Sequence, residues 1–323
     1  MRIFAALFAG LILIAAGQPA RAAEPVPVTI VVFTPPSLGA IFPSVIKQQK
    51  FDIANGVDIT FVERPPDAYA TEFNAGDFPV GGSASVLIVG LGATRGIKTS
   101  YLFNLFDYWG TVVTSRPDIT TLADLKGKQL AAAKGTTNYS MFAWLAKQQG
   151  VDPSSFQVVN TAPAGLVGYA VADRADAVQM WEPAYSLVKA VMPQIHTLDL
   201  NIAKVWRAFA GGGEIPYLGV AAHQDWIDAH RDIIPGLYRA YKQAADWVAA
   251  NPAAAAPLVA TLKDDAQRAA ITALMRDNSR LALDIKPAGK IAKAIQATYR
   301  AGLDVGLFKD MPPDSTIYNG EME

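Results

Sequence analysis

Strand-like and helix-like segments alternate along the first two thirds of the sequence, and this alternation constrains the fold more than any other feature. Residues 28–33 and 57–62 have the apolar and β-branched composition of buried strands, and residues 111–114, 129–133 and 177–180 repeat that pattern. Helical or loop segments follow each of them. Because strands that alternate with helices form βαβ units, the pattern predicts an α/β fold with mostly parallel sheet.

The last third of the chain has a different pattern. From residue 224 to residue 299 the apolar residues recur with a helical period, and the predicted helices span 232–250, 252–262, 265–276 and 288–299. A chain of 323 residues is long enough for about two domains. The sequence therefore predicts α/β domains followed by a helical C-terminal segment.

The N-terminus has the pattern of a cleavable signal peptide. Arg2 precedes an apolar run at 3–16, and Ala20-Arg21-Ala22 is a small-residue cleavage site. The apolar run is shorter than the roughly 20 residues that span a bilayer. We therefore expect residues 1–22 to be removed and the mature protein to be exported to the periplasm, with no cysteine to carry a lipid anchor.

Composition argues against several function classes. The formal net charge is −1, which does not favour nucleic acid or anionic lipid as a partner. The chain has no cysteine, so disulfides and thiolate chemistry are excluded. His196, His223 and His230 are the only histidines, and they lack the spacing of metal ligands. We predict no metal, no cofactor and no catalytic residue.

The most informative local stretch is a strand that runs into a helix start near residue 135. Gly135 ends the strand, Thr136 is a good helix N-cap, and Gly150 ends the helix. Thr137 and Asn138 then lie in the first turn, where backbone N–H groups have no intrahelical acceptor and favour an anion. The alternative is that Thr136 only caps the helix.

Two more predicted strand-to-helix junctions and the end of one strand carry similar residues. Ser37 follows the first strand, and Ser83 and Ser85 follow Gly81-Gly82. Trp181 and Glu182 follow the strand at 177–180, at the edge where parallel sheets place their ligands. Trp181 offers a stacking face, and Glu182 offers an acceptor for a ligand N–H or for an exposed backbone N–H. Each alone is also compatible with an ordinary turn.

Several motifs in this order carry a resemblance to a known family. They are LADLKGK at 122–128, GTTNYS at 135–140, ADA at 175–177, WEP at 181–183 and the helical segment 225–252. In this order they resemble the substrate-binding proteins of nitrate/sulfonate/taurine-type ABC transporters. The resemblance spans nearly the whole mature chain.

The resemblance implies a type 2 periplasmic-binding-protein fold, with two α/β lobes joined by two crossings. Lobe 1 would comprise 24–114 plus 219–323, and lobe 2 would comprise 115–218. Asp173 stands where the family often has glycine, in a turn that needs left-handed backbone. The ligand-binding residues implied by motif position are Ser37, Ser83, Ser85, Thr136, Thr137 and Glu182, with Asn138 and Trp181 beside them.

The same resemblance implies the function. The expected protein is a monomeric solute-binding component that delivers a small organic anion to an ABC permease and its ATPase, with a sulfonate or taurine favoured. Tyr101, Phe103, Phe106, Tyr108 and Trp109 form an aromatic set that either packs the core or lines the cleft. In the second case an aromatic carboxylate or pyrimidine competes, and nitrate is a further alternative. A periplasmic sensor or an enzyme on the same fold is the less favoured interpretation.

Overall fold

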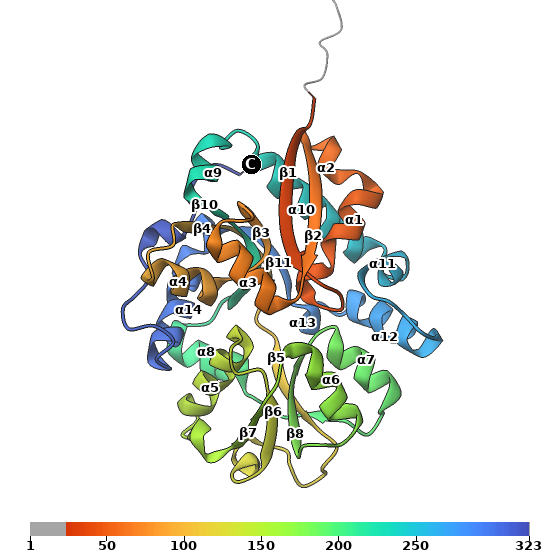
Figure 1. Cartoon of the computed structure of the whole chain (residues 1–323). Helices are drawn as coiled ribbons and strands as arrows, with labels where there is room; N and C mark the ends of the chain where they lie inside the picture. The colour runs from red at the N-terminus through yellow and green to blue at the C-terminus, as the bar shows by residue number, and fades with distance from the viewer. Residues whose placement is uncertain (1–23, 323) are drawn as a thin grey trace, which may run out of the picture.

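The computed structural model describes residues 24–322, so the predicted signal peptide lies outside the described residues. The chain forms two lobes, with the N-terminal and C-terminal thirds in the upper lobe of Figure 1 and the middle of the chain in the lower lobe. Each lobe contains one sheet with helices against it. This is the two-lobed α/β fold that the sequence predicted.

The first lobe contains a six-stranded sheet in the order β11-β4-β10-β3-β1-β2. β1 pairs in parallel with β2 and β3, whereas β10 is antiparallel to β3 and β4, and β11 is antiparallel to β4. Val and Ile side chains of the central strands are buried between the helices, which explains the continuous apolar runs in the sequence. The strands are β1 (Val26–Phe33), β2 (Val57–Arg64), β3 (Val80–Ser85), β4 (Thr99–Asp107), β10 (Pro216–His223) and β11 (Leu283–Pro287).

The second lobe contains a five-stranded sheet in the order β7-β6-β8-β5-β9. β6 is parallel to β7 and β8, and β5 is antiparallel to β8 and β9. The expectation of mostly parallel sheet was therefore wrong, because strands that enter from the other lobe, such as β5 and β10, run against their neighbours. The strands are β5 (Gly110–Thr114), β6 (Gln129–Ala132), β7 (Gln157–Asn160), β8 (Ala177–Trp181) and β9 (His196–Thr197).

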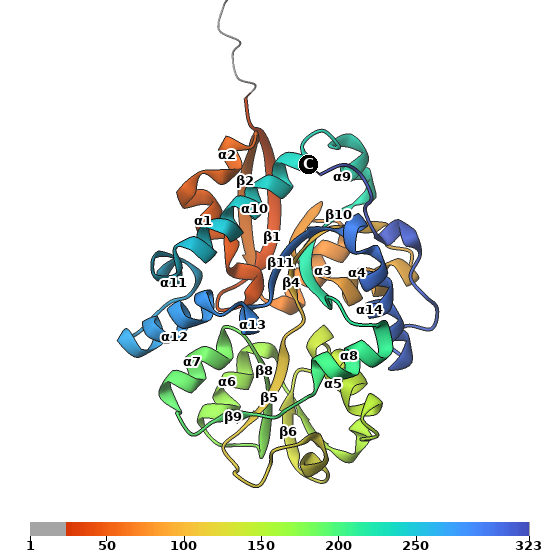
Figure 2. The same cartoon turned by 180° about the vertical axis from the view of Figure 1, so that it is seen from behind.

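The helices before the C-terminal segment cover the faces of these sheets. In the first lobe they are η1 (Leu38–Ala40), α1 (Phe42–Gln49), α2 (Phe51–Ala54), α3 (Pro66–Ala75) and α4 (Val86–Thr94). In the second lobe they are η2 (Leu122–Leu125), α5 (Thr137–Gln148), η3 (Pro153–Ser155), α6 (Pro163–Val171) and α7 (Ala184–Val191). α8 (Ile202–Ala210) lies between the lobes on the way back to β10 (Figure 2).

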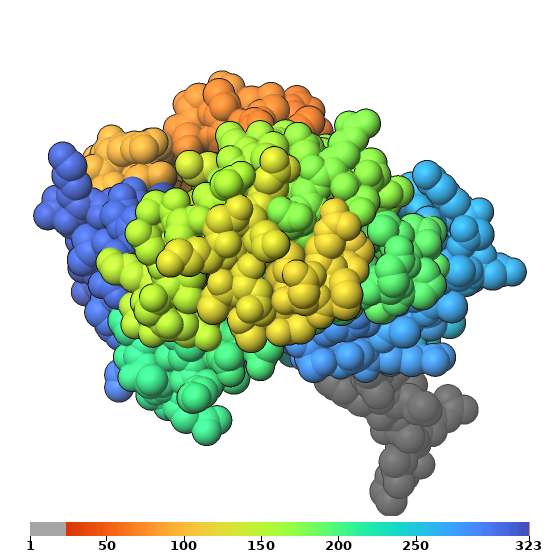
Figure 3. All heavy atoms as spheres, turned by 90° about the horizontal axis from the view of Figure 1, so that it is seen from below, coloured from red at the N-terminus to blue at the C-terminus, as the bar shows by residue number. Residues whose placement is uncertain are grey.

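The C-terminal segment is helical as predicted, and it also contributes the short strand β11, which the sequence did not reveal. Its elements are α9 (Gln224–Ala229), α10 (Ile234–Ala250), α11 (Pro252–Val259), α12 (Asp265–Arg276), α13 (Asn278–Leu281), η4 (Ala288–Ile291), α14 (Ala292–Asp304) and η5 (Asp314–Thr316). From the first lobe, α12 reaches α7 and α14 reaches α5. Seen from the second lobe, the C-terminal segment is visible on both sides (Figure 3).

The chain crosses between the sheets twice. It passes from β4 to β5 through Tyr108 and Trp109, and it returns from β9 to β10 through α8 and Gly211-Gly212-Gly213. The predicted lobe boundaries, at 114/115 and 218/219, lie a few residues beyond these changes of sheet. Which residues move together as lobes stays a prediction.

One predicted junction has a different local structure. Gly81, Gly82, Ser83 and Ser85 belong to β3, and α4 begins only at Val86. A Cβ on Gly81 would overlap the Tyr69 hydroxyl, and one on Gly82 would lie 2.8 Å from the Tyr241 hydroxyl. The glycines therefore permit close packing within the strand and do not form a turn.

The turn at Asp173 agrees with the sequence. Asp173 has φ of 52°, in the left-handed region where an aspartate replaces glycine at small cost. It immediately precedes the segment that leads into β8. The departure from glycine at this position therefore leaves the predicted turn intact.

Candidate functional site

The two lobes meet at two hydroxyl groups that the sequence singled out. The Ser85 hydroxyl, at the end of β3 in the first lobe, is in close hydrogen-bonding contact with the Thr137 hydroxyl, at the start of α5 in the second lobe. Both residues are buried. The structure therefore shows the lobes closed against each other at the N-terminus of α5. We call Ser85, Thr137, Asn138 and Tyr217 the interlobe junction.

The start of α5 is built as its sequence predicted. Thr136 is the N-cap, with its hydroxyl accepting from the Tyr139 N–H at 3.3 Å and donating to the Ala133 carbonyl at 2.8 Å. Thr137 and Asn138 are the first two helical residues, and their N–H groups have no intrahelical acceptor by helix geometry. Two backbone donors and the positive end of a 12-residue helix thus lie at the junction.

Asn138 connects this helix start to the first crossing and to β10. Its side-chain Nδ2 donates to the Tyr217 hydroxyl at 2.6 Å, and the Tyr108 hydroxyl donates to the Asn138 backbone carbonyl at 3.4 Å. Its Oδ1 is buried and has no hydrogen-bond partner among the described residues, and a Cβ on Gly110 would lie 2.8 Å from it. Burial raises the pKa of Tyr108 and of Tyr217, so both phenols are neutral. The polar groups at this point are uncharged.

Ser83 contacts the end of β1 and the loop that follows it, and Ser37 lies in that loop. The Ser83 hydroxyl accepts from the Phe33 N–H at 2.9 Å and donates to the Gly39 carbonyl at 3.1 Å, so it fastens the loop after β1 to β3. The Ser37 hydroxyl is buried without a hydrogen-bond partner among the described residues. Of these two serines, Ser37 has the side chain that is still available for another partner.

Glu182 occupies a separate position beyond the end of β8. Its side chain is fully buried, and Oε2 accepts from the Ser186 N–H at 3.0 Å, at the start of α7. Oε1 lies 3.4 Å from Nη1 of Arg280, which belongs to the first lobe. Burial raises the pKa of Glu182, and the Arg280 guanidinium and Ser186 partly offset that effect. The backbone N–H contact is one of the two roles that the sequence left open for Glu182.

The aromatic set divides between the core and the crossing. Tyr101, Phe103 and Phe106 are fully buried in the sheet of the first lobe. Tyr108 and Trp109 lie at the first crossing, where the Trp109 ring is 5.9 Å from that of Tyr185 in α7. Trp181, the last residue of β8, is partly exposed and lies opposite Gly110. Tyr108, Trp109 and Trp181 therefore remain near the place where the lobes meet.

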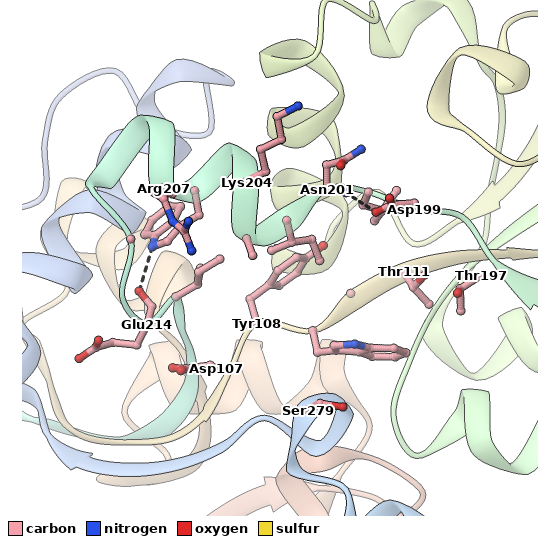
Figure 4. Close-up of a pocket in the computed structure, with 18 of the residues that line it drawn as sticks. Asp107, Tyr108, Thr111, Thr197, Asp199, Asn201, Lys204, Arg207, Glu214 and Ser279 are labelled. Carbon is pink, nitrogen blue, oxygen red and sulfur yellow. Dashed lines mark hydrogen bonds between the residues drawn. The ribbon is translucent and has the colours of Figure 1, made fainter.

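The structure also has a hollow of about 700 Å³ at the crossings, which we call the hinge cavity (Figure 4). Tyr108 and Trp109 from the first crossing line it, together with residues 197–204, 206–207 and 212–215 on the way back to the first lobe. In Figure 4, Tyr108 lies between Glu214 and Arg207 on one side and Asp199 and Thr197 on the other. None of the eight residues predicted to bind ligand lines this cavity.

Within the hinge cavity, Asp107 has the most perturbed carboxyl group. Burial, with the nearby Asp284 as the next cause, raises the pKa of Asp107 to about 7. Lys286 and the Asn104 amide act in the opposite direction. The Asn104 Nδ2 donates to Asp107 at 3.2 Å. Asp107 is the last residue of β4, directly before the first crossing.

The sequence analysis did not identify three buried or interlobe residues, namely Tyr217, Arg280 and Gln179. Tyr217 and Arg280 carry no local motif. Gln179 lies inside an ordinary apolar strand, and both of its amide atoms are buried without hydrogen-bond partners among the described residues.

Residues 24–322 contain no group of three or more His, Asp or Glu side chains arranged to hold a metal ion. Among these same residues, no helix is long and apolar enough to cross a membrane.

Comparison with known proteins identifies the family. The model of the family described as "NMT1/THI5 like" matches residues 48–255, which is more than half of the chain. The protein belongs to the NMT1/THI5-like family. This agrees with the resemblance to nitrate/sulfonate/taurine-type substrate-binding proteins that the sequence motifs showed. A search of curated proteins found no match.

Solved structures similar to this NMT1/THI5-like chain have the periplasmic-binding-protein fold. The alkanesulfonate-binding protein SsuA from Xanthomonas axonopodis pv. citri, bound to MOPS, is 18% identical with a TM-score of 0.74, over 92% of this chain and 99% of that chain. The periplasmic aliphatic sulphonate binding protein SsuA from Escherichia coli is 19% identical with a TM-score of 0.68, over 91% and 96%. At this level of identity the likeness shows the fold.

Proposed function

We propose that the protein is the periplasmic solute-binding component of an ABC importer, and that it captures a small organic anion between its lobes. The observation that carries the proposal is the Ser85–Thr137 contact, in which one hydroxyl from each lobe meets at the first turn of α5. A ligand that touches both lobes favours the closed state, and a permease and its ATPase then recognise that state. The protein would act as a monomer.

The junction supports a ligand with a singly charged oxyanion. Its donors are the N–H groups of Thr137 and Asn138 and the hydroxyls of Ser85 and Thr137. The Ser37 hydroxyl, in the loop after β1, has no partner among the described residues, and we propose it as a further donor. Such neutral donors at a helix N-terminus suit a sulfonate, a carboxylate or nitrate. Because similar solved structures include sulfonate-binding proteins, we favour a sulfonate or taurine as the ligand of this protein. Trp181 and Trp109 keep an aromatic carboxylate or a pyrimidine as the second candidate.

The histidines support binding in place of catalysis. Each histidine has one ring nitrogen that is hydrogen-bonded to a backbone carbonyl. His196 contacts the carbonyl of Ile119, His223 contacts that of Phe73, and His230 contacts that of Trp226. The Ser85 and Thr137 hydroxyls contact each other and not a basic side chain. A nucleophile there would lack the general base that hydroxyl chemistry needs. We therefore place the alternative of an enzyme below that of a sensor.

The first experiment is a thermal-shift screen of the mature protein from Ala23 onward. The ligands are taurine, alkanesulfonates, nitrate, aromatic carboxylates and pyrimidines. A ligand at about 100 times its dissociation constant should add roughly 2.7 kcal/mol to the free energy of unfolding. Stabilisation by sulfonates supports the proposal, and stabilisation only by aromatic compounds selects the second candidate. No stabilisation by any of these classes would contradict capture of a small organic anion.

The role of the α5 N-terminus is tested by Thr137→Pro, which removes one N–H donor. Proline is well tolerated at the first position of a helix, so the fold should persist. We expect the affinity for the anion to fall about tenfold, since a hydrogen bond to a charged group contributes about 1.5 kcal/mol or more. Calorimetric titration with the best ligand of the screen measures the change.

Two controls make this test specific. Thr137→Val removes the hydroxyl and keeps the N–H, so it separates the two donors. Asp265→Pro places proline at the first position of α12, which also follows an extended N-cap residue. Equal affinities for Thr137→Pro and Thr137→Val would show that the backbone N–H does not hold the ligand.

A further inference from the structure

The short helix α13 presents one side chain of the first lobe to the second lobe. The Asp277 carboxylate accepts from the Ser279 N–H at 3.0 Å. The Asn278 side chain accepts from the Leu283 backbone N–H at 2.8 Å and donates to the Leu283 backbone carbonyl at 3.1 Å. Leu281 is buried. These contacts fix the turn from both ends, so the residue between them, Arg280, projects from a rigid base. In Figure 1, α13 lies directly between the two lobes.

Arg280 contacts the second lobe through two residues. Its Nη1 lies 3.4 Å from Oε1 of Glu182, and its guanidinium carbon lies 5.7 Å from the centre of the Tyr185 ring. Within its own lobe, Nε lies 3.7 Å from Asp277. The guanidinium is therefore held between a carboxylate and an aromatic face of the opposite lobe.

Glu182 depends on this contact. It is 0% exposed, and Arg280 is the only cation within ion-pair distance of it among residues 24–322. The Ser186 N–H satisfies Oε2, whereas Oε1 has no hydrogen bond from any described residue. A buried carboxylate without a partner is strongly disfavoured. Separating the lobes would withdraw the guanidinium and remove that partner.

We infer that Arg280 is a positioning residue: its ion pair with buried Glu182 latches the C-terminal segment of the first lobe to the second lobe. The latch adjoins the packing of α12 against α7, and it stabilises the closed arrangement without a contact to ligand. Its effect on affinity rests on the proposed function. Its effect on lobe opening does not, because opening can be measured in the free protein.

The opposite side of the molecule offers a contrast. There the Lys147 ammonium donates to the Asp304 carbonyl at 2.6 Å, and the Trp144 indole N–H lies 3.4 Å from the Asp304 carboxylate. Lys147 is exposed, and water can replace its contact when the lobes part. The Arg280 side involves a fully buried carboxylate, so we assign the larger closing effect to that side.

The experiment measures the distance between the lobes by fluorescence energy transfer. The chain has no cysteine, so labels can be placed at single cysteines that replace exposed Ala75 in the first lobe and exposed Ala123 in the second. Arg280→Met keeps the stem and removes the charge. We expect the open fraction of the ligand-free protein to rise about tenfold or more. Arg280→Lys should restore part of the closure.

Arg276→Met is the matched control, because Arg276 is exposed and lies one turn earlier on the same segment. Glu182→Gln should open the lobes like Arg280→Met, and the double variant should open them no further, as expected for one shared contact. Equal opening in Arg280→Met and Arg276→Met would overturn the latch. If Arg280→Met fails to fold, Arg280→Lys and Glu182→Gln test the latch instead. The open fraction of each must then exceed that of Arg276→Met.

Taurine titrations of the same labelled variants then test the link to binding. We expect Arg280→Met to raise the dissociation rate of taurine several-fold with little change in the association rate, because the latch acts after encounter. Failure of the unmodified protein to bind taurine would count against the favoured ligand and leave the lobe-distance result standing. An unchanged dissociation rate in an opened variant would show that the latch does not contribute to retention.

Discussion

Tyr108 lines the hinge cavity and contacts the interlobe junction through Asn138, but the chemistry of these two regions differs. At the junction, the Tyr108 hydroxyl donates to Asn138, among hydroxyls and amides that carry no charge. In the hinge cavity, Tyr108 lies with Asp107, Lys204, Arg207 and Glu214 around an open volume of about 700 Å³ (Figure 4). The junction is closed and neutral, and the cavity is open and charged.

This difference follows from what closure costs. Groups that are buried when the lobes meet must lose water, and uncharged hydroxyls and amides lose it at far smaller cost than carboxylates or ammonium groups. In the hinge cavity, by contrast, the charged side chains of Lys204 and Arg207 are exposed and keep contact with water. Glu182 is the exception on the closing surfaces, and there Arg280 supplies the opposite charge. Closure can therefore be readily reversible.

The largest effect on stability is expected at Asp107 in the hinge cavity. Its pKa is raised to about 7, so the folded state holds a proton that the unfolded chain releases near pH 4. The stabilising contribution is thus present below about pH 4 and is lost as the pH rises through about 7. Asp107→Asn keeps an acceptor for the Asn104 hydrogen bond and cannot ionise, so the variant does not lose stability as the pH rises. At pH 8 we expect it to stabilise the protein by up to about 4 kcal/mol.

The measurement is the difference in the free energy of unfolding between variant and parent, from urea titrations between pH 4 and pH 8. That difference should grow with pH. Asp199→Asn is the control, because Asp199 is an exposed carboxylate of the same cavity. A difference for Asp107→Asn that stays flat with pH would mean that the cavity leaves this carboxyl fully hydrated.

The next effect compares the two regions by adding the same bulk to each. Ser85→Phe places a ring where the Ser85 and Thr137 hydroxyls meet, so the lobes cannot close without strain. Thr197→Phe places the same ring at an exposed position of the hinge cavity. We expect Ser85→Phe to weaken ligand binding about tenfold to a hundredfold, since overpacking costs about 1–3 kcal/mol. Thr197→Phe should leave the affinity within about twofold.

Calorimetry with the best ligand of the screen provides both affinities, and circular dichroism confirms that both variants fold. The opposite ranking, with Thr197→Phe the weaker binder, would move the ligand from the junction to the hinge cavity. This pair of variants therefore decides between the two regions without knowledge of the ligand's structure.

Features with a local cause could be predicted from the sequence. The start of α5 at Thr136 and Thr137 depends on a cap and on the apolar face that follows, and both are visible within a few residues. Glycines were less informative. The pattern at Gly81 and Gly82 predicts a junction into a helix, whereas both lie within β3. They are glycines because the Tyr69 and Tyr241 side chains leave no room for a Cβ there.

Contacts between distant segments could not be predicted. Tyr217 and Asn138 are 79 residues apart, and nothing near Tyr217 in the sequence marks it as a partner of α5. Arg280 likewise belongs to an ordinary short helix, and only the return of the C-terminal segment to the second lobe brings it to Glu182. The strand β11 was missed for the same reason, since its pairing with β4 is what makes it a strand.

The smallest effect is expected from Tyr217→Phe, which removes one hydroxyl from the junction. The Asn138 Nδ2 then loses its acceptor in a buried site, which should lower the free energy of unfolding by about 1 kcal/mol. Tyr139→Phe is the matched control, because Tyr139 lies in the first turn of α5 and its hydroxyl has no hydrogen bond to any described residue. Urea denaturation compares the two variants. Equal stabilities would show that water replaces the Tyr217 hydroxyl, and the junction would then be wetter than the closed lobes imply. A selective loss for Tyr217→Phe, accompanied by a several-fold weaker affinity, would show that β10 orients Asn138 for the ligand.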